Sequence, residues 1–313
     1  MGSKDLLDEI TDHIISNIPT SKLWATTVSL AAMAPFVSGV EFKLRTYGFV
    51  RSNWFALAVG PSGISNKSLP NNIIIRPIYH KVEEILKANS TVNQPDFVMP
   101  AGPSEAIISW LEKTSNHGLI IDDEFTSLLK ASVSKDYMSD YMEFLTKLSD
   151  GYGMRRFTYK HGIQNINEVN VSMISTTTPY MYKVISRDTF LQGVSNRFVY
   201  TVFRDDDMQE VQSKYNDETA DNFFILERVQ NPVYNKDNDI AAKIADLYLA
   251  LQDSWIAVPT AAAARMLLEY RWKKKRQAAS MFHDTGVGDY EYSYIDRLPE
   301  KLFKVVIVLG LNL

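Results

Sequence analysis

The chain has 313 residues, 45% of them hydrophobic and 22% charged, and a formal net charge of −4. This is the composition of an ordinary globular protein, long enough for one large core or two modest domains. The acidic balance excludes nucleic-acid binding through overall charge, so any such surface would be a local basic patch. The sequence contains no cysteine, which excludes disulfides and thiolate metal sites.

No apolar run approaches the roughly 18 residues that span a bilayer, and the N-terminus lacks the layout of a signal peptide. We therefore expect a cytoplasmic protein without a membrane partner. The chain stops within the apolar pattern LFKVVIVLGLNL without a helix cap. This ending suggests a segment of a longer protein.

The first part of the chain shows helical periodicity. Apolar residues at helical spacing predict helices over residues 4–17 and 21–37, which form an N-terminal helical region, residues 1–44. A short apolar run from Trp54 to Val59 ends in Gly-Pro and predicts a buried strand. The next predicted helix covers residues 68–87, where Pro77 should produce a kink.

A short strand is predicted at residues 97–99, followed by a helix at 104–113 with Ser104 as its N-cap. The apolar stretch Gly118–Ile121 predicts a second buried strand that ends in acidic residues. Helical spacing then runs from about residue 124 to 148, with a break near Ser132.

Glycine, asparagine and aromatic residues predict an inserted hairpin at about 155–171, leading into a strand at 169–175. A short helix follows, and the last strand, at 198–203, ends in an acidic loop. Strands that alternate with helices predict an α/β core over residues 45–210 with a mainly parallel, five-stranded sheet. Helical patterns at residues 240–254, 259–283 and 294–311 indicate a C-terminal helical region, residues 211–313.

The stretch GPSGISNKS follows the first predicted buried strand and precedes a helix. It departs from the phosphate-loop pattern G-x-x-x-x-G-K-[ST] by one extra residue and by Asn66 in place of the last glycine. Because asparagine tolerates left-handed backbone angles, Asn66 can keep the shape of the loop. Lys67 would reach the β- and γ-phosphates, and the Ser68 hydroxyl would help to hold Mg²⁺. The alternative is a glycine-proline turn with a chance Lys-Ser pair. The candidate nucleotide-binding residues are Gly60, Pro61, Ser62, Gly63, Ile64, Ser65, Asn66, Lys67 and Ser68.

The stretch LIIDDEF places acidic residues at the end of the second buried strand. Phosphoryl transfer needs one carboxylate that helps to hold a metal and a residue that positions the attacking water. We assign Asp123 to the metal and Glu124 to the water. The alternative is a set of solvated acids that favours the start of a helix.

Two further motifs follow in order. ISTTTP places hydroxyls at the end of the next strand, the edge where parallel α/β sheets bind ligands. Thr177, or a neighbouring threonine, could contact the γ-phosphate or the water, although a hydroxyl-rich turn is the better explanation of this motif taken alone. GVSNRF places Arg197 before the last strand, where it could act in trans as an arginine finger. The alternative is a structural arginine that bridges to the acids at 205–207.

Together these motifs resemble a P-loop ATPase of the AAA+ type, and in particular the helicase domains of plasmid- and virus-encoded primase-helicases and related predicted replication ATPases. GPSGISNKS, IIDDEF and GVSNRF carry the resemblance, which covers about residues 53–203 and extends loosely to DRLPEKLFKVV at 296–306. It implies ATP and Mg²⁺ as cofactors, a homo-oligomeric ring, and a helicase or translocase activity on DNA in replication. The alternatives are a non-hydrolysing nucleotide- or DNA-binding assembly module and a packaging-type ATPase.

In related helicases a β-hairpin at the position of residues 155–171 points into the ring channel. Basic residues there can follow phosphates and aromatic residues can stack on bases, whereas the alternative is an ordinary exposed hairpin. A second basic run, RWKKKRQ at 271–277, is typical of a solvated helix face but could contact DNA or a neighbouring subunit. The candidate DNA-binding residues are Arg155, Arg156, Phe157, Tyr159 and Lys160.

Overall fold

The computed structural model describes residues 5–37, 40–44, 48–89, 96–114, 116–134, 138, 140–158, 162–166, 168–184, 193–213, 232–251 and 255–257, with scattered positions between 265 and 304. Its central element is a five-stranded sheet in the order β4-β5-β8-β3-β9, in which every pair is parallel. The predicted α/β class with a parallel sheet is therefore confirmed. The strands are β3 (Phe55–Val59), β4 (Val98–Pro100), β5 (His117–Asp122), β8 (Asn170–Thr177) and β9 (Phe198–Val202).

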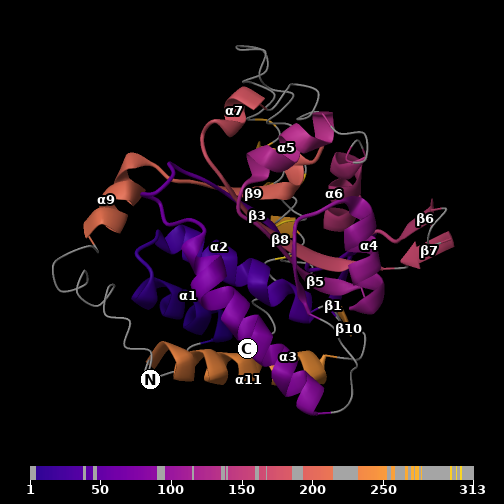
Figure 1. Ribbon diagram of the computed structural model, residues 1–313, viewed down its shortest axis with the longest axis horizontal. Helices are drawn as coiled ribbons and strands as arrows, with labels where there is room; N and C mark the ends of the chain where they lie inside the picture. Colours follow the sequence, from indigo (N-terminus) through magenta and orange to yellow (C-terminus); the bar gives the residue numbers. More distant parts are fainter. Residues whose placement is uncertain are drawn as a thin grey trace.

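Helices lie on both sides of this sheet (Figure 1). Strand β3 shows why its sequence is a continuous apolar run. Ala56 and Ala58 belong to one core, and Phe55, Leu57 and Val59 belong to the other, because successive side chains point to opposite faces. The first core includes residues of α1 (Leu6–Asn17), α2 (Lys22–Met33), α3 (Arg76–Ala88) and α11 (Pro232–Ala250), and the second those of α4 (Ser104–Lys113), α5 (Phe125–Ser134) and α6 (Tyr141–Asp150).

The two N-terminal helices form as their sequences predict. The Asp5 carboxylate accepts a hydrogen bond from the backbone of Asp8, and the Ser21 hydroxyl accepts one from Trp24, so each helix begins with a side-chain cap. A short 3₁₀ helix, Ala34–Val37, continues α2. A three-stranded sheet that the sequence did not indicate then follows, with β1 (Val40–Leu44) between β2 (Gly48–Val50) and β10 (Trp255–Ala257).

The helix after the candidate phosphate loop begins at Leu69 and contains a π-helical turn, Asn71–Ile75, immediately before α3. The Arg76 N–H donates to the Asn71 carbonyl, which is five residues back rather than four. This shifted ladder stands directly before Pro77, which has no N–H to donate and whose ring crowds the preceding turn. The local disturbance expected at Pro77 therefore takes the form of a π turn.

Two local predictions need correction. Ser104 is the first helical residue of α4 rather than its cap, and its hydroxyl donates to the Asp140 carboxylate instead. The acidic stretch after β9 is not a loop, because Asp205 begins helix α9 (Asp205–Ser213). Its three aspartates lie in the first turn, where the helix dipole favours negative charge.

The predicted hairpin is present between α6 and β8. Strand β6 (Met154–Thr158) pairs antiparallel with β7 (Gly162–Ile166), and the two strands extend away from the main sheet beside α4 (Figure 1). Strand β8 begins at Asn170, so the hairpin is shorter than residues 155–171. Between β8 and β9 the structure describes the short helix α7 (Met181–Val184) and a 3₁₀ turn, Ser195–Arg197.

The structure describes only part of the C-terminal region in which three helices were predicted. Helix α11 begins at Pro232, earlier than the predicted range 240–254, and ends at Ala250. The described residues between 265 and 276 are helical, whereas most of 294–311 lies outside the described residues. Within the described ranges, no helix combines the length and hydropathy needed to cross a bilayer.

Candidate functional site

Three of the predicted motifs meet at the carboxyl edge of the sheet. Strand β8 lies between β3 and β5, so the hydroxyl-rich motif stands between the candidate phosphate loop and the acids. Val59 is paired with Thr177, and Asp122 with Ser175. In parallel α/β sheets this edge is where ligands bind.

The candidate phosphate loop is hydrogen-bonded to the N-terminal helical region. Asn66 has a left-handed backbone, with φ of 48°, as its residue type predicted. Its side-chain amide donates to the Pro19 carbonyl over 2.8 Å. The Trp24 indole donates to the Lys67 carbonyl, also over 2.8 Å. Asn66, which stands where the usual pattern has glycine, therefore adopts a left-handed backbone angle and also anchors the loop through its side chain.

The base of the loop is fixed and its tip is exposed. The Gly60 N–H donates to the Thr177 carbonyl over 3.1 Å, and a Cβ at Gly60 would lie 3.0 Å from the Phe203 ring, so this glycine allows the phenyl ring to pack. Ser62, Gly63 and Ile64 are exposed at the tip. This leaves the tip backbone accessible to a ligand.

Lys67 lies inside the loop, with only 9% of its surface exposed. Its ammonium donates to the Pro61 carbonyl over 3.4 Å, and the Ser65 hydroxyl donates to the same oxygen over 2.8 Å. Burial lowers the pKa of the Lys67 ammonium, and the carboxylate of Glu124 partly offsets this by raising it. The Glu124 carboxylate, which belongs to a separate motif, therefore affects the Lys67 ammonium electrostatically.

Asp122 is the first acid of the motif, and the sequence interpretation assigned it no role. It is the last residue of β5, and its carboxylate accepts hydrogen bonds from the Ser175 hydroxyl and from the Glu124 backbone. Burial raises the pKa of Asp122 to about 6, the neighbouring carboxylates of Asp123 and Glu124 add to the rise, and both hydrogen bonds oppose it. Its position as the last residue of a buried apolar strand was the sequence feature that could have identified it.

The other two acids lie in the turn that follows. Asp123 and Glu124 are both exposed, and the Asp123 carbonyl accepts a hydrogen bond of 2.8 Å from the Thr176 hydroxyl. The hydroxyls of Thr177 and Thr126 are 2.6 Å apart and buried. The hydroxyls of β8 therefore fasten the acidic turn and α5 to the sheet.

Arg197 lies at the opposite, amino edge, next to the start of β3. Its guanidinium donates to both oxygens of the Asp150 carboxylate and to the Gly193 carbonyl. Its carboxylate partner is thus Asp150, from the end of α6, rather than the acids at 205–207. At about 3.3 Å per residue, the length of β3 separates Arg197 from the loop by roughly 16–20 Å. Arg197 is therefore too far away to act on the loop of its own chain.

The candidate DNA-binding residues are described only in part. Arg155, Arg156 and Phe157 belong to β6, whereas Tyr159 and Lys160 lie outside the described residues. In the basic run at 271–277, the described side chains of Trp272, Lys273 and Arg276 are exposed on a helix. This exposure fits a solvated helix face.

Among the described residues, no group of three or more His, Asp or Glu side chains is arranged to hold a metal ion. Mg²⁺ at phosphate sites needs only one or two protein carboxylates, because phosphates and water supply the other ligands. Ser68 and Asp123 each follow a strand that ends at the carboxyl edge, β3 and β5 respectively. No protein-family model matches the chain, and no curated protein matches it.

Proposed function

We propose that the chain is the ATP-dependent motor domain of a DNA helicase or translocase that acts in replication, a P-loop ATPase of the AAA+ type. The observation that carries the proposal is that β3, β8 and β5 pair side by side, so the loop that carries Lys67 and the turn that carries Glu124 lie at the same carboxyl edge of the sheet. Phosphoryl transfer depends mostly on positioning and charge stabilisation, and it requires a phosphate-binding cation close to a water-positioning residue.

The loop supplies the binding groups. Lys67 and the exposed backbone N–H groups at the tip would bind the phosphates, and the positive end of the following helix would add to this attraction. Ser68 and Asp123 would hold Mg²⁺, which supplies charge stabilisation on the phosphate oxygens when bound. Glu124 would orient the attacking water. Asp122 would fix the acidic turn through its bond to Ser175.

Arg197 would act on the nucleotide of a neighbouring subunit in a ring. Since Arg197 is too far from the loop of its own chain, a role in catalysis would require the loop of another subunit. To act in trans, its guanidinium would have to leave Asp150, so this pair would open during assembly or turnover.

The hairpin would contact DNA. Strands β6 and β7 extend from the body of the domain (Figure 1). The hairpin sequence combines arginine and lysine with aromatic residues. Arginine and lysine bind the backbone of a strand, and aromatic side chains stack on its bases.

A non-hydrolysing nucleotide-binding module is the second candidate, and one observation favours it. Lys67 and Ser65 both donate to the Pro61 carbonyl, so the loop is hydrogen-bonded to itself. A phosphate would have to replace Pro61 as the partner of Lys67.

Nucleotide binding can be tested by titration with a fluorescent ATP analogue in the presence of Mg²⁺. We expect Lys67→Ala to weaken binding at least about tenfold, because it removes a charged partner of phosphate. The control is Lys113→Ala, an exposed lysine at the end of α4, which should bind like the wild type. Equal affinity in the wild type and Lys67→Ala would overturn both candidate functions.

A further inference from the structure

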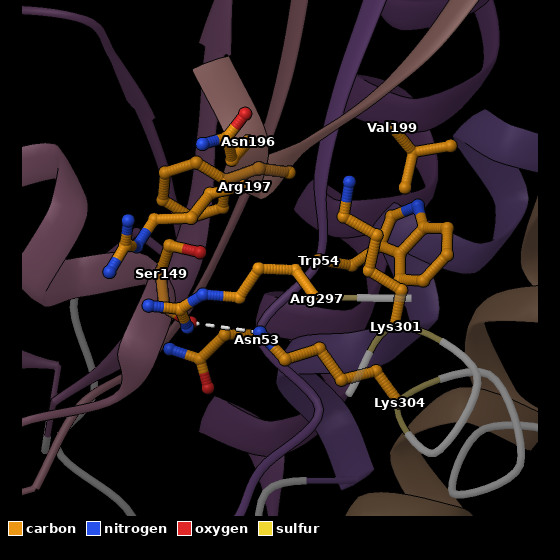
Figure 2. Close-up of a pocket in the computed structure, with 10 residues that line it drawn as sticks. Asn53, Trp54, Ser149, Asn196, Arg197, Val199, Arg297, Lys301 and Lys304 are labelled. Atoms are coloured by element: carbon orange, nitrogen blue, oxygen red, sulfur yellow. Dashed lines mark hydrogen bonds between the residues drawn. The ribbon is translucent and has the colours of Figure 1, made fainter. Parts of the chain in front are cut away.

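The carboxylate of Asp150, at the end of α6, accepts hydrogen bonds from two arginines. Arg197 donates to both of its oxygens, through Nε to Oδ1 over 2.9 Å and through Nη2 to Oδ2. Arg297 donates through Nη1 to Oδ1 over 3.0 Å. Figure 2 shows the side chains of both arginines extending to the same side, beside Ser149. One carboxylate oxygen is therefore shared by two guanidinium groups.

The two arginines differ in how deeply they lie. The side chains of Arg197 and Asp150 are each 10% exposed, whereas the side chain of Arg297 is 31% exposed. Arg197 is also held by the Gly193 carbonyl, to which it donates over 2.7 Å. A carboxylate left alone at the depth of Asp150 is costly, because its charge has lost most of its water. Arg197 can therefore leave readily only if another cation stays on Asp150.

Arg297 belongs to a set of three C-terminal residues that contact both sides of this pair. Arg297, Lys301 and Lys304 have the spacing of one helix face, and the Lys301 N–H donates to the Arg297 carbonyl over 3.1 Å. Lys304 donates to the Ser149 carbonyl over 2.9 Å, as the dashed line in Figure 2 marks. Lys301 donates to the Phe198 carbonyl over 2.8 Å. Ser149 and Phe198 are the chain neighbours of the paired aspartate and arginine, so this face contacts both segments that carry the pair.

We propose that Arg297 holds the Asp150 carboxylate when Arg197 turns toward the nucleotide of a neighbouring subunit. The inference rests on the role in trans that the proposed function gives to Arg197, and it adds the residue that makes release possible. One guanidinium can bind both oxygens of a carboxylate, so Arg297 can take the oxygen that Arg197 gives up. Arg297 is then a positioning residue, and its segment determines how readily Arg197 is released.

The competing explanation is purely structural. In that case Arg297 only fastens the C-terminal residues to α6, and Arg197 never leaves Asp150. The two explanations differ in two measurable ways. Exchange requires that Arg297 can bind Asp150 without the help of Arg197. It also requires that the effect of Arg297 on ATP turnover passes through Arg197.

Urea denaturation tests the first requirement without ATP. In an Arg197→Gln background, Asp150→Asn should still lower the unfolding midpoint, because the carboxylate is paired with Arg297. In an Arg197→Gln/Arg297→Gln background, Asp150→Asn should raise the midpoint instead, because it removes an unpaired buried charge. The comparison is a double-mutant cycle for Asp150 and Arg297. The same shift in both backgrounds would overturn the inference.

ATP turnover tests the second requirement. Arg297→Gln should lower turnover about tenfold and leave the affinity for a fluorescent ATP analogue unchanged, because Arg297 acts on Arg197 and not on the loop. Arg297→Lys keeps the charge and should recover most of the loss. In an Arg197→Gln background, Arg297→Gln should cause no further loss. The control Lys113→Gln, which removes an exposed charge from α4, should match the wild type.

The outcomes separate this inference from the proposed function. An equal fold loss from Arg297→Gln with and without Arg197, or no loss at all, would overturn the role of Arg297 alone. Absent turnover in the wild type would contradict the proposed function and, with it, the role of Arg197 in trans. Because the Arg297 side chain is partly exposed, its single variants should remain folded, so the turnover test does not depend on the multiple variants.

Discussion

The side-chain amide of Asn66 donates a hydrogen bond of 2.8 Å to the backbone carbonyl of Pro19. This bond joins the candidate phosphate loop to the N-terminal helical region, and the left-handed backbone of Asn66 supports the same loop shape. The residue that departs from the usual glycine pattern is therefore a structural anchor. It keeps the backbone angle that glycine would provide and adds a partner that glycine cannot bind.

Two substitutions at Asn66 should separate the effect of its left-handed backbone angle from the effect of its hydrogen bond to Pro19. Asn66→Gly keeps the left-handed angle and loses the hydrogen bond, so we expect about 1 kcal/mol of destabilisation. Asn66→Ala loses the bond and adds about 1 kcal/mol or more of backbone strain. Urea denaturation of both variants measures the order. An Asn66→Ala variant as stable as the wild type would contradict the role of this position.

Asp122 should make stability depend on pH. Its pKa is raised from 3.8 to about 6 in the folded protein, so between these values the folded state holds a proton that the unfolded chain releases. Stability therefore falls as pH rises through this window. The free energy of unfolding, wild type minus Asp122→Asn, should fall by on the order of 2–3 kcal/mol between about pH 4 and pH 6.5. A difference that is independent of pH would show that Asp122 is not buried in this way.

The Asp150 carboxylate should be important for stability because it accepts hydrogen bonds from Arg197 and Arg297. Asp150→Asn leaves the largely buried guanidinium of Arg197 without its charged partner, which costs about 3 kcal/mol. Glu143→Gln is the matched control, on the same helix but in an exposed pair with Lys147. Chemical denaturation should show a large loss of stability for Asp150→Asn and no change for the control. Equal effects would contradict the assigned partner of Arg197.

The hairpin can be tested by the salt dependence of DNA binding. The double variant Arg155→Ala/Arg156→Ala should bind single-stranded DNA more weakly. It should also reduce the slope of log affinity against log salt by about 1.4 if both arginines contact phosphates. The control is Lys273→Ala/Arg276→Ala in the exposed helix. If only the control loses affinity, DNA binds the basic run at 271–277 instead of the hairpin.

The main sheet could be predicted because its signal is local. Trp54–Val59 and Gly118–Ile121 are short apolar runs bounded by polar or turn residues, which is how a parallel strand buried on both faces looks in sequence. The three-stranded sheet could not be predicted in this way. It joins Val40–Leu44 to the three-residue strand Trp255–Ala257, too short to show a periodicity and far away in the chain.

The same distinction between local motifs and long-range contacts applies to the candidate site. The candidate phosphate loop and the acids were proposed from short motifs, whereas their hydrogen-bond partners come from distant positions. Pro19 binds Asn66, and Ser175 binds Asp122, and neither contact leaves a pattern in the sequence. The partner of Arg197 was predicted wrongly for this reason, because the acids at 205–207 are near in sequence but Asp150 is near in space.

ATP hydrolysis with and without single-stranded DNA tests the central proposal most directly, with the wild type, Lys67→Ala, Glu124→Gln and the control Glu143→Gln measured together. We predict turnover that DNA stimulates in the wild type and the control, and a loss on the order of 100-fold or more in the other two variants, because Lys67 binds the phosphates and Glu124 positions the water. Absent turnover in the wild type, or equal turnover in all four proteins, would contradict the proposal that this chain is an ATP-driven motor.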